Sequence, residues 1–398
     1  MTHMPGLLAP TPRQVEIMSL AEGLAKRFSP RAGGPGFPHE NYPELHSAGY
    51  DRLMIPTAYG GGGADLFEMV LAQEILARGD ASTALVTGML ISVLGRAYAS
   101  RAWPEDVLEG ISRRVVTEGG MVNNCVTEPE LGSISRGGVP SMRAERAPGG
   151  WRLFGHKIFV TGAPALRWLV TAAMLPPEDG APQGTLCSAI VEGGSPGLRI
   201  VDTWAGSLSL RGCGNGEVFY DGVFVPDRRI VEPVVIGAGG RNRPGTNGWA
   251  LPIAAVYLGV GQAALDAACA YAQERVPPSL GRPIAEQPHI IQWIGEMEAV
   301  LSAARAVLHE TARAWVDHPS LRQALGPRIG MAKYLCTNAA CEATEKALRV
   351  AGGFSLTKEL PLERYFRDAR AGLFQPPQDD LALGQVDRAA LARASGTD

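Results

Sequence analysis

The sequence predicts an α+β protein in which helices and strands occupy separate stretches of the chain. Helical periodicity covers residues from about 11 to 118 and returns from about 246 to 395. Between them, short β-branched runs are divided by Gly, Pro and Asp clusters. A chain of 398 residues usually forms two or three domains. We therefore predict an N-terminal helical domain at 1–118, a middle β domain at 119–234 and a C-terminal helical domain at 235–398.

Two helices are predicted in the first domain. The run Phe67–Ala77 has apolar residues at three- and four-residue spacing, and Gly60–Gly63 precedes it as a loop. Ala81–Ser100 is more apolar, so we expect it to be a buried helix.

Short strands are predicted in the second domain. Trp168–Ala173 and Cys187–Val191 are apolar and contain β-branched residues. Glu217–Pro226 is predicted to form a strand, a turn and a second strand.

Three long helices are predicted in the third domain. An alanine-rich helix is expected from Gly259 onward, and further helices at Ile291–Asp317 and Arg328–Ala351. Alanine-rich helices pack closely, as they do in helical bundles.

Composition excludes several function classes. The net charge of -3 provides no basic face, so no nucleic-acid partner is expected. No apolar run reaches 18 residues and the N-terminus lacks a signal-peptide pattern, so no membrane partner is expected. The six cysteines have no C-x-x-C spacing, which favours buried free thiols in a reducing cytoplasm. The seven histidines do not cluster, so no metal site is expected.

Two segments about 30 residues apart carry the clearest functional signal. The first is Asn124–Ser133, with Thr127-Glu128-Pro129 at its centre, and the second is Gly155–Gly162. Together they resemble the flavin-contacting segments of the acyl-CoA dehydrogenase family, with the patterns "C-x-T-E-P-x-x-G-S" and "G-x-K-x-[WF]-I-T". Each segment alone would also fit an ordinary turn between strands. The family resemblance implies a middle β-barrel-like domain and a C-terminal four-helix bundle.

The resemblance implies that these segments bind FAD. Matching residues bond the pyrimidine side of the flavin ring, cover the ring with an aromatic side chain, approach N5 and pass the pyrophosphate. Small hydroxyl side chains and glycine suit these contacts, because they donate hydrogen bonds or permit close backbone approach. The cofactor-binding candidates here are Asn124, Val126, Thr127, Gly132, Ser133, Phe159, Val160 and Thr161.

The resemblance continues beyond residue 270. Tyr271–Arg275 followed by Leu280–Ile284 is similar to "Y-x-x-E-R-x-x-F-G-x-P-I", with a longer gap and Leu280 in place of the aromatic residue. In the family, the arginine matching Arg275 reaches the FAD of a neighbouring subunit. The alternative is a solvated arginine that the helix dipole favours at a C-terminus.

Two further strings extend the match. Arg349–Gly353 is similar to "Q-x-x-G-G-x-G-Y", and Leu360–Arg370 to "Y-P-x-E-R-x-x-R-D-A-R". Gly352 and Gly353 match a turn that passes the partner's FAD. The cofactor candidates from this part of the chain are therefore Arg275, Leu280, Arg349, Gly352 and Gly353. A helix C-cap is also compatible with Gly352. The resemblance implies a homo-oligomer, either a dimer or a tetramer built as a dimer of dimers. Arg367, Asp368 and Arg370 are expected to form an ion-pair network.

The chain departs from the family at the catalytic base. Typical members continue with a segment like "I-x-x-I-Y-E-G-T", whose glutamate removes the α-proton of the thioester. Here Pro376 takes the glutamate position beside Gln375, and neither can act as a base. The alternative base position, on the helix before "L-G-x-x-Q", holds Trp249. Asp379 and Asp380 are the nearest carboxylates, although capping of the next helix explains them equally. The catalytic residue is therefore unassigned, and Gln378 in this segment is a cofactor candidate.

We therefore predict an FAD-dependent oxidoreductase of acyl-CoA dehydrogenase type. Its substrate would be an unusual acyl thioester of specialised metabolism, carried on CoA or on an acyl carrier protein. Either the catalytic base is relocated in the enzyme, or the enzyme oxidises an alcohol at the carbon next to the carbonyl. The electron acceptor would be a flavoprotein or oxygen. The alternative is a flavin monooxygenase or oxidase that uses reduced flavin and oxygen and needs no glutamate. A non-enzymatic interaction protein is a third hypothesis, against which Thr127, Phe159 and Thr161 argue.

Overall fold

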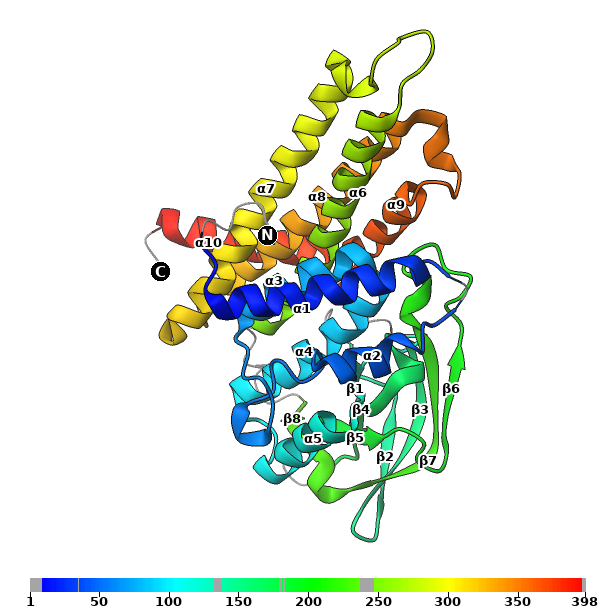
Figure 1. The fold of residues 1–398 in the computed structure, drawn as a ribbon. Coiled ribbons are helices and arrows are strands. Elements are labelled where there is room, and N and C mark those ends of the chain that lie inside the picture. Colours follow the sequence, from blue (N-terminus) through cyan, green and yellow to red (C-terminus); the bar gives the residue numbers. More distant parts are fainter. Residues whose placement is uncertain are drawn as a thin grey trace.

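Helices and strands are segregated along the chain, which confirms the predicted fold class (Figure 1). The structure is a computed structural model that describes residues 9–34, 36–131, 138–178, 181, 183–236 and 247–395. Figure 1 shows the sheet at one end of the molecule, the long C-terminal helices at the other, and the N-terminal helices between and beside them. The three parts meet around one large cavity, described below.

The N-terminal helices begin at side-chain caps and fill the centre of the molecule. Thr11 caps α1 and Asp65 caps α3, each in a capping box with the residue three positions later. Almost all of α3 and α4 is buried, and most of the buried residues are apolar, although α3 also buries Glu68, Gln73 and Glu74. Helix α4 has the bounds Ala81–Ser100 that were predicted from its apolar sequence, and it is buried as expected. The helices are α1 (Pro12–Phe28), α2 (Asn41–Ala48), α3 (Leu66–Gly79), α4 (Ala81–Ser100) and α5 (Glu105–Glu118).

The middle of the chain forms one mixed, eight-stranded sheet. Its strand order is β6-β7-β3-β2-β4-β5-β8, and β1 pairs with β4 in parallel. The order has two ends, β6 and β8, so the described strands form an open sheet. The strands are β1 (Met121–Cys125), β2 (Arg143–Ala147), β3 (Gly150–Val160), β4 (Leu166–Leu175), β5 (Thr185–Glu192), β6 (Leu198–Asp202), β7 (Gly216–Pro226) and β8 (Ile230–Val235).

The turn expected within Glu217–Pro226 is wrong. Both halves of Glu217–Pro226 pair with the same strand, β3, so the segment is one continuous strand. The register shifts there: Val223 pairs with Leu153 and Asp221 with Phe154, leaving Gly222 without an opposing residue. Gly222 has φ +69, which fits a bulge as well as a turn.

Three long helices dominate the C-terminal part. They start earlier than predicted: α6 begins at Leu251, and Pro288 and Gly326 begin the next two, with a proline in the first turn of each. Helix α6 packs against α8, α7 and α3 and so joins the C-terminal part to the N-terminal helices. The helices are α6 (Leu251–Glu274), α7 (Pro288–Asp317), α8 (Gly326–Ala351), α9 (Leu362–Arg370) and α10 (Asp379–Ser395).

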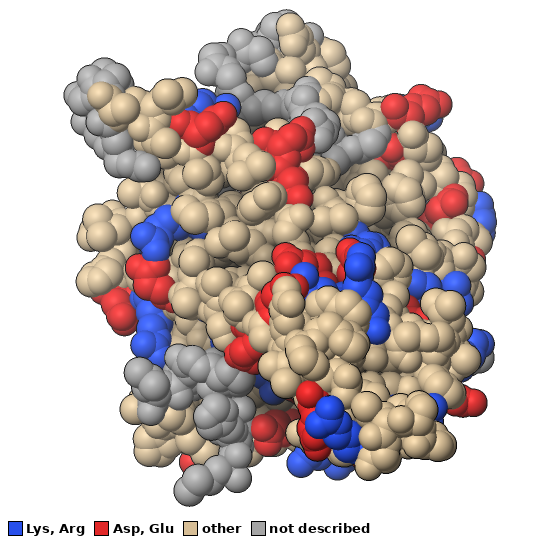
Figure 2. Space-filling model, turned by 90° about the horizontal axis from the view of Figure 1, so that it is seen from above, with Lys and Arg blue, Asp and Glu red and all other residues tan. Residues whose placement is uncertain are grey.

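Two helical segments are long and apolar enough to cross a membrane by length and composition alone. These are Ala81–Ser100 and Gly248–Glu274, but 78% and 72% of their most apolar windows are buried inside the fold. That burial is what helices of a protein core show. On the face drawn in Figure 2, basic and acidic side chains lie in small interspersed clusters among the residues that are coloured.

Candidate active site

A cavity of about 1280 Å³ lies where the sheet, α4, the start of α6 and the segment after α9 meet. This volume exceeds that of most small-ligand pockets. Two of its walls correspond to segments singled out in the sequence. We call Asn123–Thr127 with Ile158–Thr161 the β wall, and Arg370–Gln378 the C-terminal wall. The cavity is lined by Met89, Ser92, Asn123, Asn124, Val126, Thr127, Ile158, Phe159, Thr161, Leu186, Trp204, Leu208, Ser209, Asn215, Val234, Asn247, Ala250, Ile253, Arg370, Ala371, Phe374, Gln375, Pro376, Gln378 and Leu381.

A buried ion pair holds the two segments of the β wall together. Lys157 Nζ donates to Glu128 Oε1 at 2.6 Å, and both side chains are at most 2% exposed. Glu128 also accepts from the backbone and hydroxyl of Ser141 and from the backbone of Met142. Burial opposes the charge on Glu128, but its bonds to Lys157 and Ser141 outweigh it and hold the pKa of the carboxyl below its usual range. The pair therefore fixes the Val126–Thr127 segment, which is one residue from Glu128, against β3.

Two further contacts position the β wall. The backbone N–H of Ile158 donates to the carbonyl of Thr127 at 2.9 Å. Asn123 Nδ2 donates to the carbonyl of Thr161 at 2.9 Å, which ties β1 to the end of β3. Thr161 is 5% exposed and lines the cavity.

Phe159 adopts a backbone conformation that is rare for its residue type. Its φ is +56, in the left-handed region that costs an L-residue about 1–2 kcal/mol. It lies in a register shift between β3 and β7, as expected for a bulge. The side chain is 59% exposed, lines the cavity and meets Trp204 edge-on with ring centroids 6.0 Å apart. A strained residue that presents an uncovered aromatic ring to a cavity is a common feature of a binding site.

No carboxylate lines the cavity in the part of the chain that the structure describes. On the C-terminal wall, Gln375, Pro376 and Gln378 reach the cavity. Asp379 and Asp380 do not line it and lie in the first turn of α10. Asp379 accepts from Lys333 Nζ at 3.1 Å and from Asn338 Nδ2 at 2.9 Å.

The ion-pair network expected at the end of α9 is wrong for the described contacts. Arg367 pairs with Glu363, and Asp368 instead accepts from the backbone N–H of Leu210 at 2.7 Å. Burial raises the pKa of Asp368 to about 6, against the effect of that bond. Arg370 stacks on Phe366 and lines the cavity. The expectation failed because successive residues of a helix point to different sides.

The remaining cofactor candidates lie away from the cavity lining. Val160 is buried in β3. Arg275 follows α6 and lies over the ring of Phe354, next to the turn at Gly352 and Gly353. Arg349 pairs with Glu345, and Leu280 lies in the loop between α6 and α7. Gly132 and Ser133 lie outside the described residues.

Sequence reasoning missed several lining residues. Asn123 precedes a predicted contact residue and could have been inferred because it and Asn124 are the polar residues of the short strand Met121–Cys125. Lys157 belongs to the recognised pattern, and a lysine within a strand segment signals a buried partner. Trp204, Asn215 and Asn247 carry no local signal, because only the fold brings their loops to the cavity.

Comparison with known proteins identifies the family. Its models for the N-terminal, middle and C-terminal domains of acyl-CoA dehydrogenase match residues 20–112, 123–223 and 251–374. The chain belongs to the acyl-CoA dehydrogenase family. The protein YdbM of Bacillus subtilis, named as an acyl-CoA dehydrogenase, is 39% identical over 350 residues, covering 88% of this chain and 89% of YdbM.

One further relative and one solved structure are also similar to the chain. The 3-sulfinopropanoyl-CoA desulfinase of Paraburkholderia xenovorans is 30% identical over 345 residues, covering 83% of this chain and 84% of the desulfinase. The structure of KijD3 with FMN and a dTDP-amino-keto sugar is similar with a TM-score of 0.82 and 26% identity, covering 99% of this chain and 96% of KijD3. The prediction of an acyl-CoA dehydrogenase-type flavin oxidoreductase is confirmed at the level of the family.

Proposed function

We propose that the cavity binds FAD with its ring against the β wall. The uncovered ring of Phe159 would cover the flavin, Thr161 would approach N5, and Val126 with Thr127 would meet the pyrimidine edge. A cavity of about 1280 Å³ has room for a large cofactor and a substrate group together. Bound flavin supplies two-electron chemistry, accepting electrons from a substrate or passing them to oxygen. Gly132, Ser133, Asn124 and Gln378 remain candidates for further cofactor contacts.

The substrate side of the cavity fits an acyl group. Met89 and Ser92 of α4, and Ala250 and Ile253 at the start of α6, line it with mainly apolar surface. An acyl chain bound there would be desolvated and held between two rigid helices. The acyl-CoA relatives favour a CoA thioester over a carrier-protein thioester.

The proposed activity is flavin-dependent oxidoreduction of an acyl thioester other than a plain saturated one. The absence of a lining carboxylate among the described residues, with Pro376 at the usual glutamate position, carries this proposal. The desulfinase relative acts, by its name, on 3-sulfinopropanoyl-CoA, whose acyl group carries an acidic sulfinate. A functionalised acyl group can react at a bond other than the α-C–H bond, which removes the need for that base.

A monooxygenase or oxidase reaction is the second candidate. The likeness to KijD3 with FMN favours it, because that protein binds a flavin on the same fold with a substrate that is not an acyl thioester. The same lack of a lining carboxylate is compatible with a reaction in which reduced flavin and oxygen do the chemistry.

The experiment that separates the two is anaerobic mixing. The FAD-loaded protein is mixed with a panel of acyl-CoAs that includes butyryl-CoA and acyl groups bearing hydroxyl or acidic substituents. Bleaching of the flavin by a functionalised thioester supports the dehydrogenase proposal. Bleaching only by an external flavin reductase, followed by oxygen uptake coupled to a hydroxylated product, supports the monooxygenase. Failure to bind FAD or FMN under any condition overturns both.

We also propose a homodimer or tetramer in the cytoplasm. Phe354 and Leu356, beside Arg275 and Gly352, are 45% and 78% exposed, as expected for side chains that a partner subunit covers. Arg275, Leu280, Arg349, Gly352 and Gly353 would then complete the partner's FAD site. A monomer in dilute solution with full FAD affinity would contradict this. The electron acceptor, a flavoprotein or oxygen, follows from which reaction the mixing experiment supports.

A further inference from the structure

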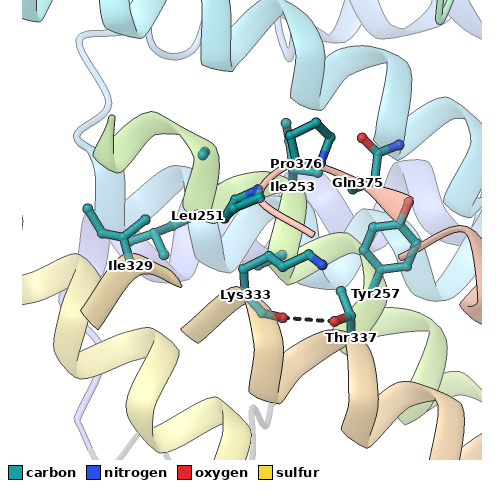
Figure 3. Close-up of a pocket in the computed structure, with 11 residues that line it drawn as sticks. Leu251, Ile253, Tyr257, Ile329, Lys333, Thr337, Gln375 and Pro376 are labelled. Atoms are coloured by element: carbon teal, nitrogen blue, oxygen red, sulfur yellow. Dashed lines mark hydrogen bonds between the residues drawn. The ribbon is translucent and has the colours of Figure 1, made fainter. Parts of the chain in front are cut away.

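A second, much smaller pocket lies behind the C-terminal wall (Figure 3). We call it the rear pocket; its polar lining is Tyr257 from α6, Lys333 and Thr337 from α8, and Gln375. It shares Ala250, Ile253, Gln375 and Pro376 with the large cavity, so the two adjoin. Its volume of about 10 Å³ is enough for one water or one substrate oxygen.

Two of the polar groups that face the rear pocket, the hydroxyl of Tyr257 and the ammonium of Lys333, can donate hydrogen bonds, and the amide of Gln375 can donate or accept. The hydroxyl of Tyr257 is completely buried and forms no well-aligned hydrogen bond among the described residues, although the amide of Gln375 lies close enough to interact with it. Burial raises its pKa far above the usual range, so it stays protonated and can donate. Figure 3 shows this hydroxyl directed toward Gln375, and the ammonium of Lys333 directed toward the ring of Tyr257. The hydroxyl of Thr337 is engaged by backbone carbonyls of its own helix.

Lys333 brings a buried positive charge with bonding capacity left over. Its side chain is 8% exposed and donates to Asp379 at 3.1 Å, whereas an ammonium has three N–H groups. Asp379 is 30% exposed and also accepts from Asn338, so its charge is shared between two donors and solvent. A glutamate at position 376 would add a negative charge beside this pocket, and Pro376 adds none.

A site with a buried hydroxyl donor and an ammonium fits an anionic oxygen. Charge-assisted hydrogen bonds are shorter and about twice as strong as neutral ones. A water could occupy the pocket, but an oxygen of a bound carboxylate would replace it and also satisfy the buried charge. An uncharged acyl chain would add no acceptor for either donor and would leave Lys333 with Asp379 as its charged partner.

We propose that the rear pocket receives one oxygen of an acidic group on the acyl chain, with Tyr257 and Lys333 as its ligands. This inference rests on the proposed function, because it takes the substrate to be an acyl thioester. It assigns the two residues to substrate specificity, as groups that select an acidic acyl chain over an apolar one.

The test compares two thioesters of equal carbon number, succinyl-CoA and butyryl-CoA. Their dissociation constants for the FAD-loaded protein are measured anaerobically by titration calorimetry. The wild type should bind succinyl-CoA about 10- to 100-fold more tightly, which corresponds to charge-assisted bonds of roughly 1.5–3 kcal/mol. Tyr257→Phe and Lys333→Met should each lower the affinity for succinyl-CoA by about 10-fold or more and leave that for butyryl-CoA unchanged.

The matched control is Lys346→Met. Lys346 is on the same helix as Lys333 but pairs with Glu296 and Glu342 and does not line either pocket. This variant should keep the full preference for succinyl-CoA. Flavin content and melting temperature are recorded for every variant. Tyr257→Phe keeps the aromatic ring that fills the core and should fold. If Lys333→Met fails to fold, Tyr257→Phe alone still tests the inference.

Two results would overturn the inference. Equal affinity of the wild type for both thioesters would show that the rear pocket holds only water, with the proposed function unaffected. A preference that survives in Tyr257→Phe would place the anion elsewhere, for example at Arg370. If neither thioester binds at all, the proposed function itself fails.

Discussion

The two walls of the cavity are stabilised in different ways. The β wall is locked by Glu128 and Lys157, an ion pair that is at most 2% exposed and tied to three further donors. The C-terminal wall is backed by Lys333 and Asp379, a pair in which the carboxylate is 30% exposed. The first wall matches the family pattern and the second departs from it at Pro376.

The difference separates cofactor binding from substrate selection. A fully buried ion pair is costly to break, so it keeps the β wall in one geometry whatever else the cavity holds. A pair with one solvated partner can exchange its bonds, and next to it stands Tyr257 with a hydroxyl that forms no well-aligned hydrogen bond among the described residues. The rigid β wall therefore suits a flavin that is the same in every reaction cycle. The C-terminal wall suits an acyl group that differs between substrates.

The largest expected effect comes from restoring a carboxylate to the C-terminal wall. Pro376→Glu should raise dehydrogenation of butyryl-CoA by about 10²-fold, the low end of the ~10²- to 10⁴-fold that a positioned base supplies. The wild type should dehydrogenate butyryl-CoA slowly or not at all. The new carboxylate should also pair with Lys333 and remove the preference for succinyl-CoA. Initial rates with an artificial electron acceptor measure this.

Pro376→Gln is the matched control, because it removes the backbone restriction of proline without supplying a base. An increase of the same size in Pro376→Gln would mean that backbone freedom, and not the carboxylate, limits the reaction. Fast turnover of butyryl-CoA by the wild type would show that another group already removes the proton.

The next effect compares the two lysines directly. Lys157→Met should cost about 3–5 kcal/mol of unfolding free energy, because it leaves Glu128 buried and charged. Lys333→Met should cost about 1 kcal/mol, because Asp379 is partly exposed and keeps its bond from Asn338. Urea denaturation of the two variants measures the difference. Equal costs would contradict the distinction between a rigid and an adaptable wall.

Much of the β wall could be predicted from sequence, because two short sequence segments form it. Val126, Thr127, Phe159 and Thr161 were named because their segments resemble the family patterns, and all four line the cavity. Local strings specify local backbone, and β3 brings the second string beside the first. Their roles toward the flavin are predictions from the family resemblance.

The rear pocket could not be predicted in this way. Tyr257, Lys333 and Gln375 lie far apart in sequence, and only the packing of α6 against α8 and of the 375–377 segment across both brings them together. None of the three belongs to a recognised pattern. The turn expected within Glu217–Pro226 failed for another reason, since glycine-containing pairs such as Asp221-Gly222 occur in β-bulges as well as in hairpin turns.

A smaller effect concerns pH and the C-terminal wall. Burial lowers the pKa of Lys333 from 10.5, although Asp379 opposes the shift. Below this lowered pKa the ammonium is charged, so the preference for succinyl-CoA should be complete at neutral pH and decline before pH reaches 10.5. Between the lowered pKa and 10.5 the unfolded chain binds the proton and the folded one does not, so this group's contribution to stability rises with pH there.

Titration calorimetry of both thioesters from about pH 7 to 10.5 tests this sign. The ratio of the two dissociation constants should fall as pH rises in the wild type and stay flat in Lys333→Met. A ratio that rises with pH in the wild type would show that Lys333 does not carry the charge that selects the substrate.

The smallest effect is expected from Thr161→Val on the β wall. The substitution keeps the size of the side chain and the carbonyl that accepts from Asn123, so the melting temperature should not change. It removes one hydroxyl that we place near flavin N5, and a single hydrogen bond is worth about 1 kcal/mol. For a two-electron couple this corresponds to a shift of about 20 mV in the flavin potential. Thr161→Ser, which retains the hydroxyl, should show no shift. Equal flavin potentials in Thr161→Val and the wild type would show that Thr161 does not contact the flavin. A large loss of FAD affinity would mean that the β wall binds the cofactor through its side chains more than through its rigid backbone.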